Sequence, residues 1–219
     1  MKSAAWKYSW LTYRRDALWF PAAFLALFAV ILSILNHPAM RYAIARAYLG
    51  FIVPLIGGIL AAYAILDDPA LELRFSTPVR AEATLAARLG LIIAVETGCA
   101  LLFQLFAAAL GVDLSPLGGL LGVQLVWFVP ALTLIAVGTA GSLAGAQSST
   151  GAFLAGGIWL IELMMKRWFE QNAKVLFVFH GLFSPGDPDL TANRCVLLSG
   201  SAILLLLSAY LLRRQERFL

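Results

Sequence analysis

Charged side chains are scarce in this sequence. Asp, Glu, Lys and Arg make up 13% of its 219 residues, whereas hydrophobic residues make up 61%. Soluble domains have about 25% charged and about 45–50% apolar residues. The composition therefore excludes an ordinary soluble domain and predicts an all-α protein that crosses a membrane several times.

Histidine, lysine and cysteine are also few, which excludes several kinds of enzyme. His37 and His180 form no H-E-x-x-H metalloprotease motif. None of the four lysines follows a glycine, so the phosphate-binding loop of P-loop ATPases is absent. Cys99 and Cys195 lie in apolar segments and indicate no disulfide framework. We expect a chain that is not an enzyme and binds no metal or cofactor.

Six apolar runs approach the length that a membrane span needs, roughly 20 mostly apolar residues. The predicted spans are residues 17–35, 47–66, 89–110, 120–143, 151–165 and 195–212. A short outer loop with Arg41 and Arg46 is expected between the first two spans.

The first 16 residues predict an amphipathic helix at the membrane interface. Trp6, Trp10 and Tyr13 recur at helical spacing on one face, whereas Lys7 and Arg14 lie off that face. Aromatic and basic side chains separated in this way are typical of helices at the headgroup boundary.

Residues 166–194 form the longest stretch between two predicted spans. Residues 175–179 are apolar but too few to cross a bilayer, and a loop with two Gly, two Pro and two Asp follows them. The pattern predicts a partly re-entrant outer segment packed against protein. Glu162 and Lys166 are spaced i, i+4, so we expect them to pair near its start.

The distribution of basic residues predicts the orientation. With six spans, ten of the 16 Lys and Arg residues fall on the side of both termini. Cytoplasmic loops carry the excess of Lys and Arg. Both termini are therefore expected in the cytoplasm.

A carboxylate and several aromatic residues occur inside the predicted spans. Glu96 lies in the third span, where exposure to lipid is costly, so it is expected to face the bundle or a cavity. It either lines a substrate path or is a structural carboxylate paired with an Arg or an interfacial aromatic residue. The candidate lining residues of a path are Glu96, Phe103, Gln104, Phe106, Trp127 and Phe128.

Glycines cluster near the inner ends of the fourth and fifth spans. They are Gly138, Gly141, Gly145, Gly151, Gly156 and Gly157. Small residues allow helices to approach closely in a membrane. The pattern favours tight packing over the alternative of a moving seam.

Residues 67–88 interrupt the apolar runs with seven charged residues in 22. Asp68–Pro69 and Thr77–Pro78 each place a helix N-cap before a proline. The pattern predicts a short helix over residues 69–75 and a second helix that continues into the third span. A segment this polar is expected to dock onto a partner protein in the cytoplasm.

The stretch LELRFSTPVRAEATLAARLG, residues 71–90, resembles the first intracellular loop of ABC-2 type transporter permeases. The matching positions are Glu72, Leu73, Ser76, Pro78, Val79, Arg80 and Arg88. An amphipathic start, six spans and a partly re-entrant outer segment also resemble that family.

The resemblance implies one permease domain over residues 1–219, half of an ABC exporter in a bacterial inner membrane. Two copies, or one copy and a paralogue, would form the pathway among membrane lipids, with no nucleic acid involved. ATP and Mg would be bound by separate ABC ATPase subunits and no cofactor by this chain. The coupling helix would contact the ATPase through Leu71, Glu72, Leu73, Arg74, Phe75, Ser76, Pro78 and Arg80.

Two other functions remain open from the residues alone. One is a membrane scaffold or assembly subunit without transport, and the other is a lipid-modifying membrane enzyme that uses Glu96. If the chain is an exporter, its apolar spans favour a lipid, hydrophobic drug or amphipathic peptide as cargo over ions and sugars.

Overall fold

The computed structural model describes the backbone of residues 2–67 and 81–213 and the side chains of residues 18–67 and 82–213. The elements are, in chain order, α1 (Lys2–Ile34), α2 (Pro38–Ala47), the π-helical turn η1 (Tyr48–Ile52), α3 (Val53–Ala62), α5 (Ala81–Ala109), η2 (Ser115–Leu117), α6 (Gly119–Gly145), α7 (Ser148–Met164), α8 (Lys166–Asn172), η3 (Lys174–Leu176), α9 (His180–Phe183) and α10 (Leu190–Leu212). No strand occurs in these described ranges, so the all-α prediction is confirmed for them.

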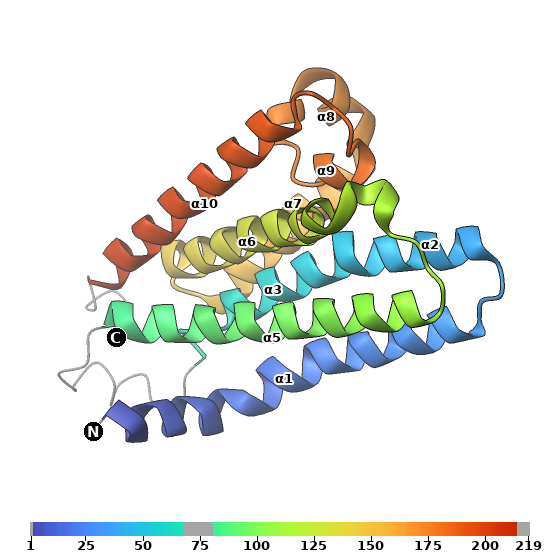
Figure 1. The fold of residues 1–219 in the computed structure, drawn as a ribbon. Coiled ribbons are helices and arrows are strands. Elements are labelled where there is room, and N and C mark those ends of the chain that lie inside the picture. The colour runs from blue at the N-terminus through green and yellow to red at the C-terminus, as the bar shows by residue number, and fades with distance from the viewer. Residues whose placement is uncertain (1, 68–80, 214–219) are drawn as a thin grey trace.

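The long helices run back and forth between two ends of one bundle (Figure 1). We name as the termini end the one where α1 begins and α10 ends; α3 also ends there and α5 begins there. The opposite end, the loop end, holds residues 35–37, 110–118 and 165–189.

Four helices are long and apolar enough to cross a membrane. They are Pro38–Ala62, Glu82–Ala109, Gly119–Gly145 and Leu190–Leu212. A fifth candidate consists of α7 and α8 together, which meet at a bend of 81°. The apolar part of α1, Leu18–Ile34, is shorter. The described residues thus support a multi-pass membrane protein with four or five spans where the sequence predicts six.

The N-terminal part of the chain differs from the prediction in two ways. Residues 2–16 and the predicted first span form one uninterrupted helix, α1, with Pro21 inside it. The outer loop predicted around Arg41 and Arg46 is wrong, because helix begins already at Pro38, where proline occupies a first-turn position.

The hydrogen bonds of Arg41 explain why a basic residue occurs near the start of α2. Its Nε donates to the carbonyl of Leu35 at 2.6 Å, and Nη1 donates to the carbonyl of Leu110 at 2.9 Å. These carbonyls follow the last residues of α1 and α5, where helices leave backbone acceptors without internal partners. The cation therefore closes two helix ends at once.

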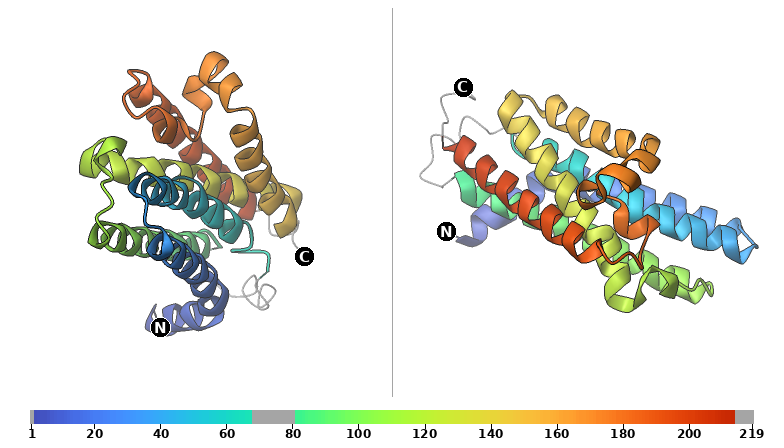
Figure 2. Two further views of the ribbon diagram at one scale, coloured as in Figure 1. Left: turned by 90° about the vertical axis from the view of Figure 1, so that its right-hand side faces the viewer. Right: turned by 90° about the horizontal axis from the view of Figure 1, so that it is seen from above.

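Helix α6 runs through the bundle and packs against α3, α7 and α10 (Figure 2). A Cβ atom on Gly138 would lie 2.2 Å from the backbone oxygen of Gly58 in α3. A Cβ atom on Gly151 of α7 would lie 2.2 Å from the backbone oxygen of Gly138. The predicted close packing is confirmed at Gly138 and Gly151. It is wrong for Gly156 and Gly157, where a Cβ atom would meet nothing within 4 Å.

Polar contacts join the helices at the termini end. Arg88 of α5 donates from Nη1 to the carbonyl of Ala64, just after α3. Ser148 at the start of α7 donates to the carboxylate of Asp67, and Arg213 pairs with Glu82. The described flanks of the segment 68–80 are thereby tied to the bundle; the predicted coupling helix itself, residues 69–75, lies outside the described residues.

We expect Gly138→Ala to lower the free energy of unfolding by about 1–3 kcal/mol, because the added methyl group must displace backbone of α3. The measurement is thermal unfolding of the purified chain in detergent. Gly156→Ala is the matched control, since its methyl group enters open space and only improves helix propensity. Equal unfolding midpoints for both variants would contradict the packing of α6 described above.

Candidate functional site

Glu96 lies near the middle of α5 and is almost completely buried, with 2% of its surface exposed. Neither carboxylate oxygen has a hydrogen-bond partner among the described residues. A buried polar group without a partner costs free energy whether it is charged or neutral. Sites that retain such a group are often functional, because the missing partner arrives from outside the chain.

The carboxylate lies against bare backbone of α3. A Cβ atom on Gly57 would lie 2.6 Å from Oε2 and 2.8 Å from Oε1 of Glu96. Any larger residue at position 57 would therefore occupy the space of the carboxylate. Gly57 is a part of this site that sequence reasoning did not identify.

A small pocket of about 10 Å³, room for about one water molecule, lies beside Glu96 between α5 and α6. Its lining residues are Ile93 and Glu96 from α5 and Trp127, Phe128, Ala131, Leu132 and Ile135 from α6. The structure thus brings together three of the six candidate path residues, Glu96, Trp127 and Phe128. The Trp127 and Phe128 rings meet edge to face, with centroids 5.7 Å apart and planes at 88°.

Gln104 does not line the pocket but is joined to it through Gln124, which sequence reasoning missed. The two amides bond reciprocally: Gln124 Nε2 donates to Gln104 Oε1 at 2.7 Å, and Gln104 Nε2 donates to Gln124 Oε1 at 3.3 Å. The indole of Trp127 donates to Gln124 Oε1 at 2.9 Å. A glutamine inside an apolar run was the signal that could have identified this partner.

The remaining candidate path residues lie elsewhere. Phe103 is fully buried and packs on the Tyr48 ring, with centroids 4.2 Å apart. Phe106 is 36% exposed and does not line the pocket. The candidate docking residues from Leu71 to Arg80 lie outside the described residues.

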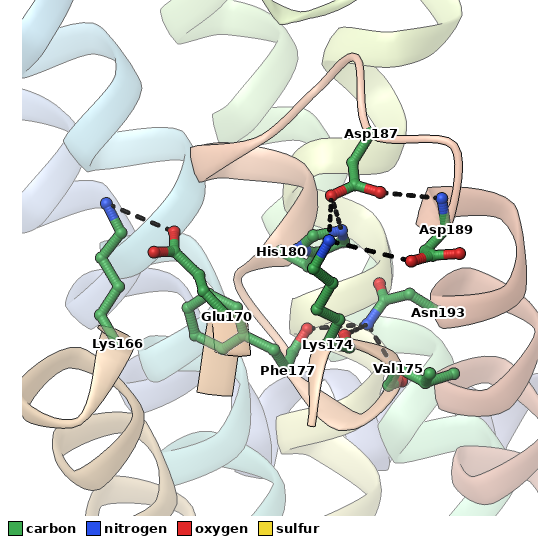
Figure 3. A network of polar contacts seen from close by, with 9 residues as sticks. All are labelled: Lys166, Glu170, Lys174, Val175, Phe177, His180, Asp187, Asp189 and Asn193. Carbon is green, nitrogen blue, oxygen red and sulfur yellow. Dashed lines mark hydrogen bonds and ion pairs between the residues drawn. The ribbon is translucent and has the colours of Figure 1, made fainter. Parts of the chain in front are cut away.

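A second polar cluster lies at the loop end, in the segment predicted to be re-entrant (Figure 3). The amide of Asn193 donates to three backbone carbonyls, those of Lys174, Val175 and Phe177, at 2.9–3.1 Å. Phe177 is fully buried and stacks on other rings of this segment. The segment is thus packed against protein, as expected from its sequence.

The predicted pair of Glu162 and Lys166 is wrong. The helix bends at Met165, so Lys166 no longer lies one turn above Glu162 on the same axis. Glu162 instead accepts the backbone N–H of Val178 at 2.8 Å. Lys166 pairs with Glu170 at 3.5 Å and lies 3.8 Å from the centre of the Phe183 ring.

Asp187 is the centre of the charged part of this cluster (Figure 3). Its Oδ2 lies 3.0 Å from Lys174 Nζ and 3.6 Å from Nε2 of buried His180, and its Oδ1 accepts the backbone N–H of Asp189 at 2.9 Å. These contacts, the backbone hydrogen bond first, hold the pKa of Asp187 below its usual value. Asp187 in turn raises the pKa of Lys174.

The two clusters differ in what they can do chemically. Asp187 itself is paired with residues of the chain, but both ring nitrogens of buried His180, like both carboxylate oxygens of Glu96, have no hydrogen-bond partner among the described residues. Among the described residues, no group of three or more His, Cys, Asp or Glu side chains is placed to hold a metal ion. We take the surroundings of Glu96 as the candidate functional site, because Glu96 lies in a helix long and apolar enough to cross a membrane, where a buried carboxylate is costly. No family model, curated protein or solved structure matches the chain.

We expect Asp187→Asn to destabilise the fold in a pH-dependent way. A carboxylate with a lowered pKa contributes stability above its unfolded pKa of about 3.9, and the contribution is lost as the pH falls through the folded pKa. The unfolding midpoint of Asp187→Asn should therefore be lower than that of the native chain at neutral pH, and the difference should vanish in acid.

The measurement is thermal unfolding in detergent between about pH 3 and about pH 8. Asp189→Asn is the matched control, because it keeps the backbone N–H that Asp187 accepts and removes only a more exposed carboxylate, 3.9 Å from Lys174. A native chain and an Asp187→Asn variant with parallel acid profiles would contradict the assignment.

Proposed function

We propose that the chain is the permease subunit of an ATP-driven ABC exporter of the ABC-2 type. Two copies, or one copy and a paralogue, form a pathway in a bacterial inner membrane, with both termini in the cytoplasm. The chain crosses the membrane six times, through α1, α2 with α3, α5, α6, α7 with α8, and α10. It carries a hydrophobic or amphipathic substrate and leaves ATP and Mg to the ATPase.

The observation that carries this proposal is the ABC-2-like sequence of residues 71–90 together with the position of its flanks. The end of α3 and the start of α5 both lie at the termini end. Asp67, five residues after α3, accepts a hydrogen bond from Ser148, and Glu82 at the start of α5 pairs with Arg213. The described residues that flank the proposed docking segment therefore lie on the side where α1 begins and α10 ends. Four of the six passes proposed correspond to helices of spanning length, α7 with α8 reaches that length only as a pair bent by 81°, and Leu18–Ile34 is shorter.

The Glu96 pocket supports an exporter over a scaffold. A scaffold needs satisfied packing, and a carboxylate without a partner in a pocket is a cost to it. A substrate path gives the same carboxylate a partner during transport. Reconstitution separates the two functions, since only an exporter raises ATP hydrolysis by its ATPase when substrate is added.

We expect the tagged full chain to retain an ABC ATPase when it is purified from its native membranes, and the double variant Leu71→Asp/Phe75→Asp to lose it. The two carboxylates would replace apolar anchors of the docking segment with charges that a buried contact disfavours. Mass spectrometry of the purified complex measures the amount of ATPase retained.

Val175→Asp/Leu176→Asp is the control for this experiment. It places the same charges on two partly or largely exposed apolar residues at the loop end. Equal recovery of the ATPase with Leu71→Asp/Phe75→Asp and with the native chain would refute docking through residues 71–80, and recovery of no ATPase with the native chain would refute the exporter.

A further inference from the structure

His180 is a buried base whose ring lacks a hydrogen-bond partner. It lies in α9 at the loop end, with 1% of its surface exposed. Neither Nδ1 nor Nε2 bonds to any group in the described part of the chain. Nε2 lies 3.6 Å from Oδ2 of Asp187, which is beyond hydrogen-bond distance. A buried ring nitrogen that stays unbonded in this way costs free energy.

The charges nearest to His180 favour a proton on its ring (Figure 3). The carboxylates of Asp187 and Asp189 share one cation, Lys174, whose Nζ lies 3.0 Å and 3.9 Å from them. With a neutral imidazole, these side chains together carry one uncompensated negative charge. A proton on His180 balances that charge, and Asp187 is already beside the ring to accept the resulting N–H.

Charged groups on the other elements around α9 do not pair with the ring. They are Glu162 of α7, Lys166 of α8, Arg194 of α10 and Arg46 of α2. Helix α6 also packs on α9 and carries no titratable side chain. The three cations oppose a further positive charge and Glu162 favours one, but among the described carboxylates only Asp187 is within ion-pair distance of the imidazole.

Asp187 joins three parts of the loop-end segment. Lys174 of η3, His180 of α9 and the backbone N–H of Asp189 before α10 meet at its carboxylate. Its contacts hold its pKa below the usual value, so it stays ionised between about pH 5 and about pH 8, where an imidazole takes up a proton. A shift of less than about 1 Å would bring Nε2 to the 2.7–2.9 Å of a charge-assisted hydrogen bond, by the usual length of about 2.8 Å.

We propose that His180 is a proton-binding site that locks residues 174–189: its imidazolium pairs with Asp187 in mild acid, and the pair is lost as the pH rises. The pair stabilises the segment below the pKa of about 6.5 of a free imidazole, until stronger acid protonates Asp187. The proton site does not rest on the proposed function. With both termini in the cytoplasm, as proposed, the loop end faces the external medium and the lock responds to external pH.

The test measures amide hydrogen exchange of residues 178–187 in the full chain in detergent, corrected for the intrinsic effect of pH on exchange. We expect about tenfold or more protection at about pH 5 relative to about pH 8, because a charge-assisted hydrogen bond forms. His180→Gln should abolish this response. Asp187→Asn keeps the imidazole but removes its counter-ion, and should abolish it as well. His37→Gln is the matched control: it removes an exposed histidine before α2 and should keep the response.

A second measurement needs no variant of the cluster to fold. In the native chain with ¹³C-labelled histidine, nuclear magnetic resonance should show the His180 ring changing charge state in step with the change in protection. The His37→Gln variant assigns the signal, since it leaves His180 as its one histidine.

Three outcomes overturn the proton lock. They are a His180 ring that keeps one charge state from about pH 5 to about pH 8, equal protection of the native segment at both pH values, and a full response in His180→Gln. None of these readouts involves the ATPase. The proton lock and the exporter therefore fail separately: loss of the lock leaves ATPase retention unchanged, and a chain without an ATPase can still show the lock.

Discussion

Backbone contact between α3, α6 and α7 is the constraint on which the rest of the structure depends. Lipid tails are as apolar as the side chains, so helices in a membrane associate mainly by close packing and by hydrogen bonds between them. Here Gly138 lets α6 approach α3 at Gly58, and Gly151 lets α7 approach α6. Helix α6 is thereby held against α3 and α7, and it also packs on α10. Helix α5 packs on α1 and α3 and meets α6 through side chains, including the Gln104–Gln124 pair, and the pocket lies between α5 and α6.

Two consecutive glycines on α3, Gly57 and Gly58, contact different neighbouring helices. Successive residues of a helix point about 100° apart, so Gly58 faces α6 and α7 while Gly57 faces α5. The first allows the tight seam, and the second leaves the space that the Glu96 carboxylate occupies. The same bare strip of backbone thus makes the core dense on one side and accommodates a buried acid on the other. A buried polar group without a hydrogen-bond partner is uncommon in native structures and requires a structural or functional explanation.

Apolar length predicted most of the long helices from the sequence, because the cost of exposed backbone in lipid makes helix the necessary outcome for such runs. The predicted spans behind α6 and α10 agree with the structure within five residues, whereas α5 begins eight residues before its predicted span. The predicted loop at Arg41 is wrong because the prediction relied on the charge of Arg41. Only the fold shows that two helix ends supply hydrogen-bond acceptors for this charge. The predicted pair of Glu162 and Lys166 is wrong because an i, i+4 spacing brings two side chains together only in a straight helix, and this helix bends at Met165. Glu96 was recognisable as a buried acid, but its lack of a partner and its contact with Gly57 depend on helices distant in sequence.

The placement of Glu96 on α5 bears on how an exporter of this design would work. Helix α5 follows directly on the segment proposed to dock the ATPase, and Glu96 lies about 22 Å along its axis from Ala81. A helix transmits a displacement of its first turn over that distance because its backbone hydrogen bonds keep it rigid. Arg88 links α5 to the end of α3, and Gly57 of α3 bounds the carboxylate, so the two helices share a contact near the termini end and one at the pocket. Movement of α5 against α6 would then alter the pocket and the Gln104–Gln124 pair without disturbing the contacts of Gly138 with Gly58 and Gly151. Such a device needs two stable positions of α5 that substrate and ATPase would each bias, and the Gln104–Gln124 pair would have to rearrange between them.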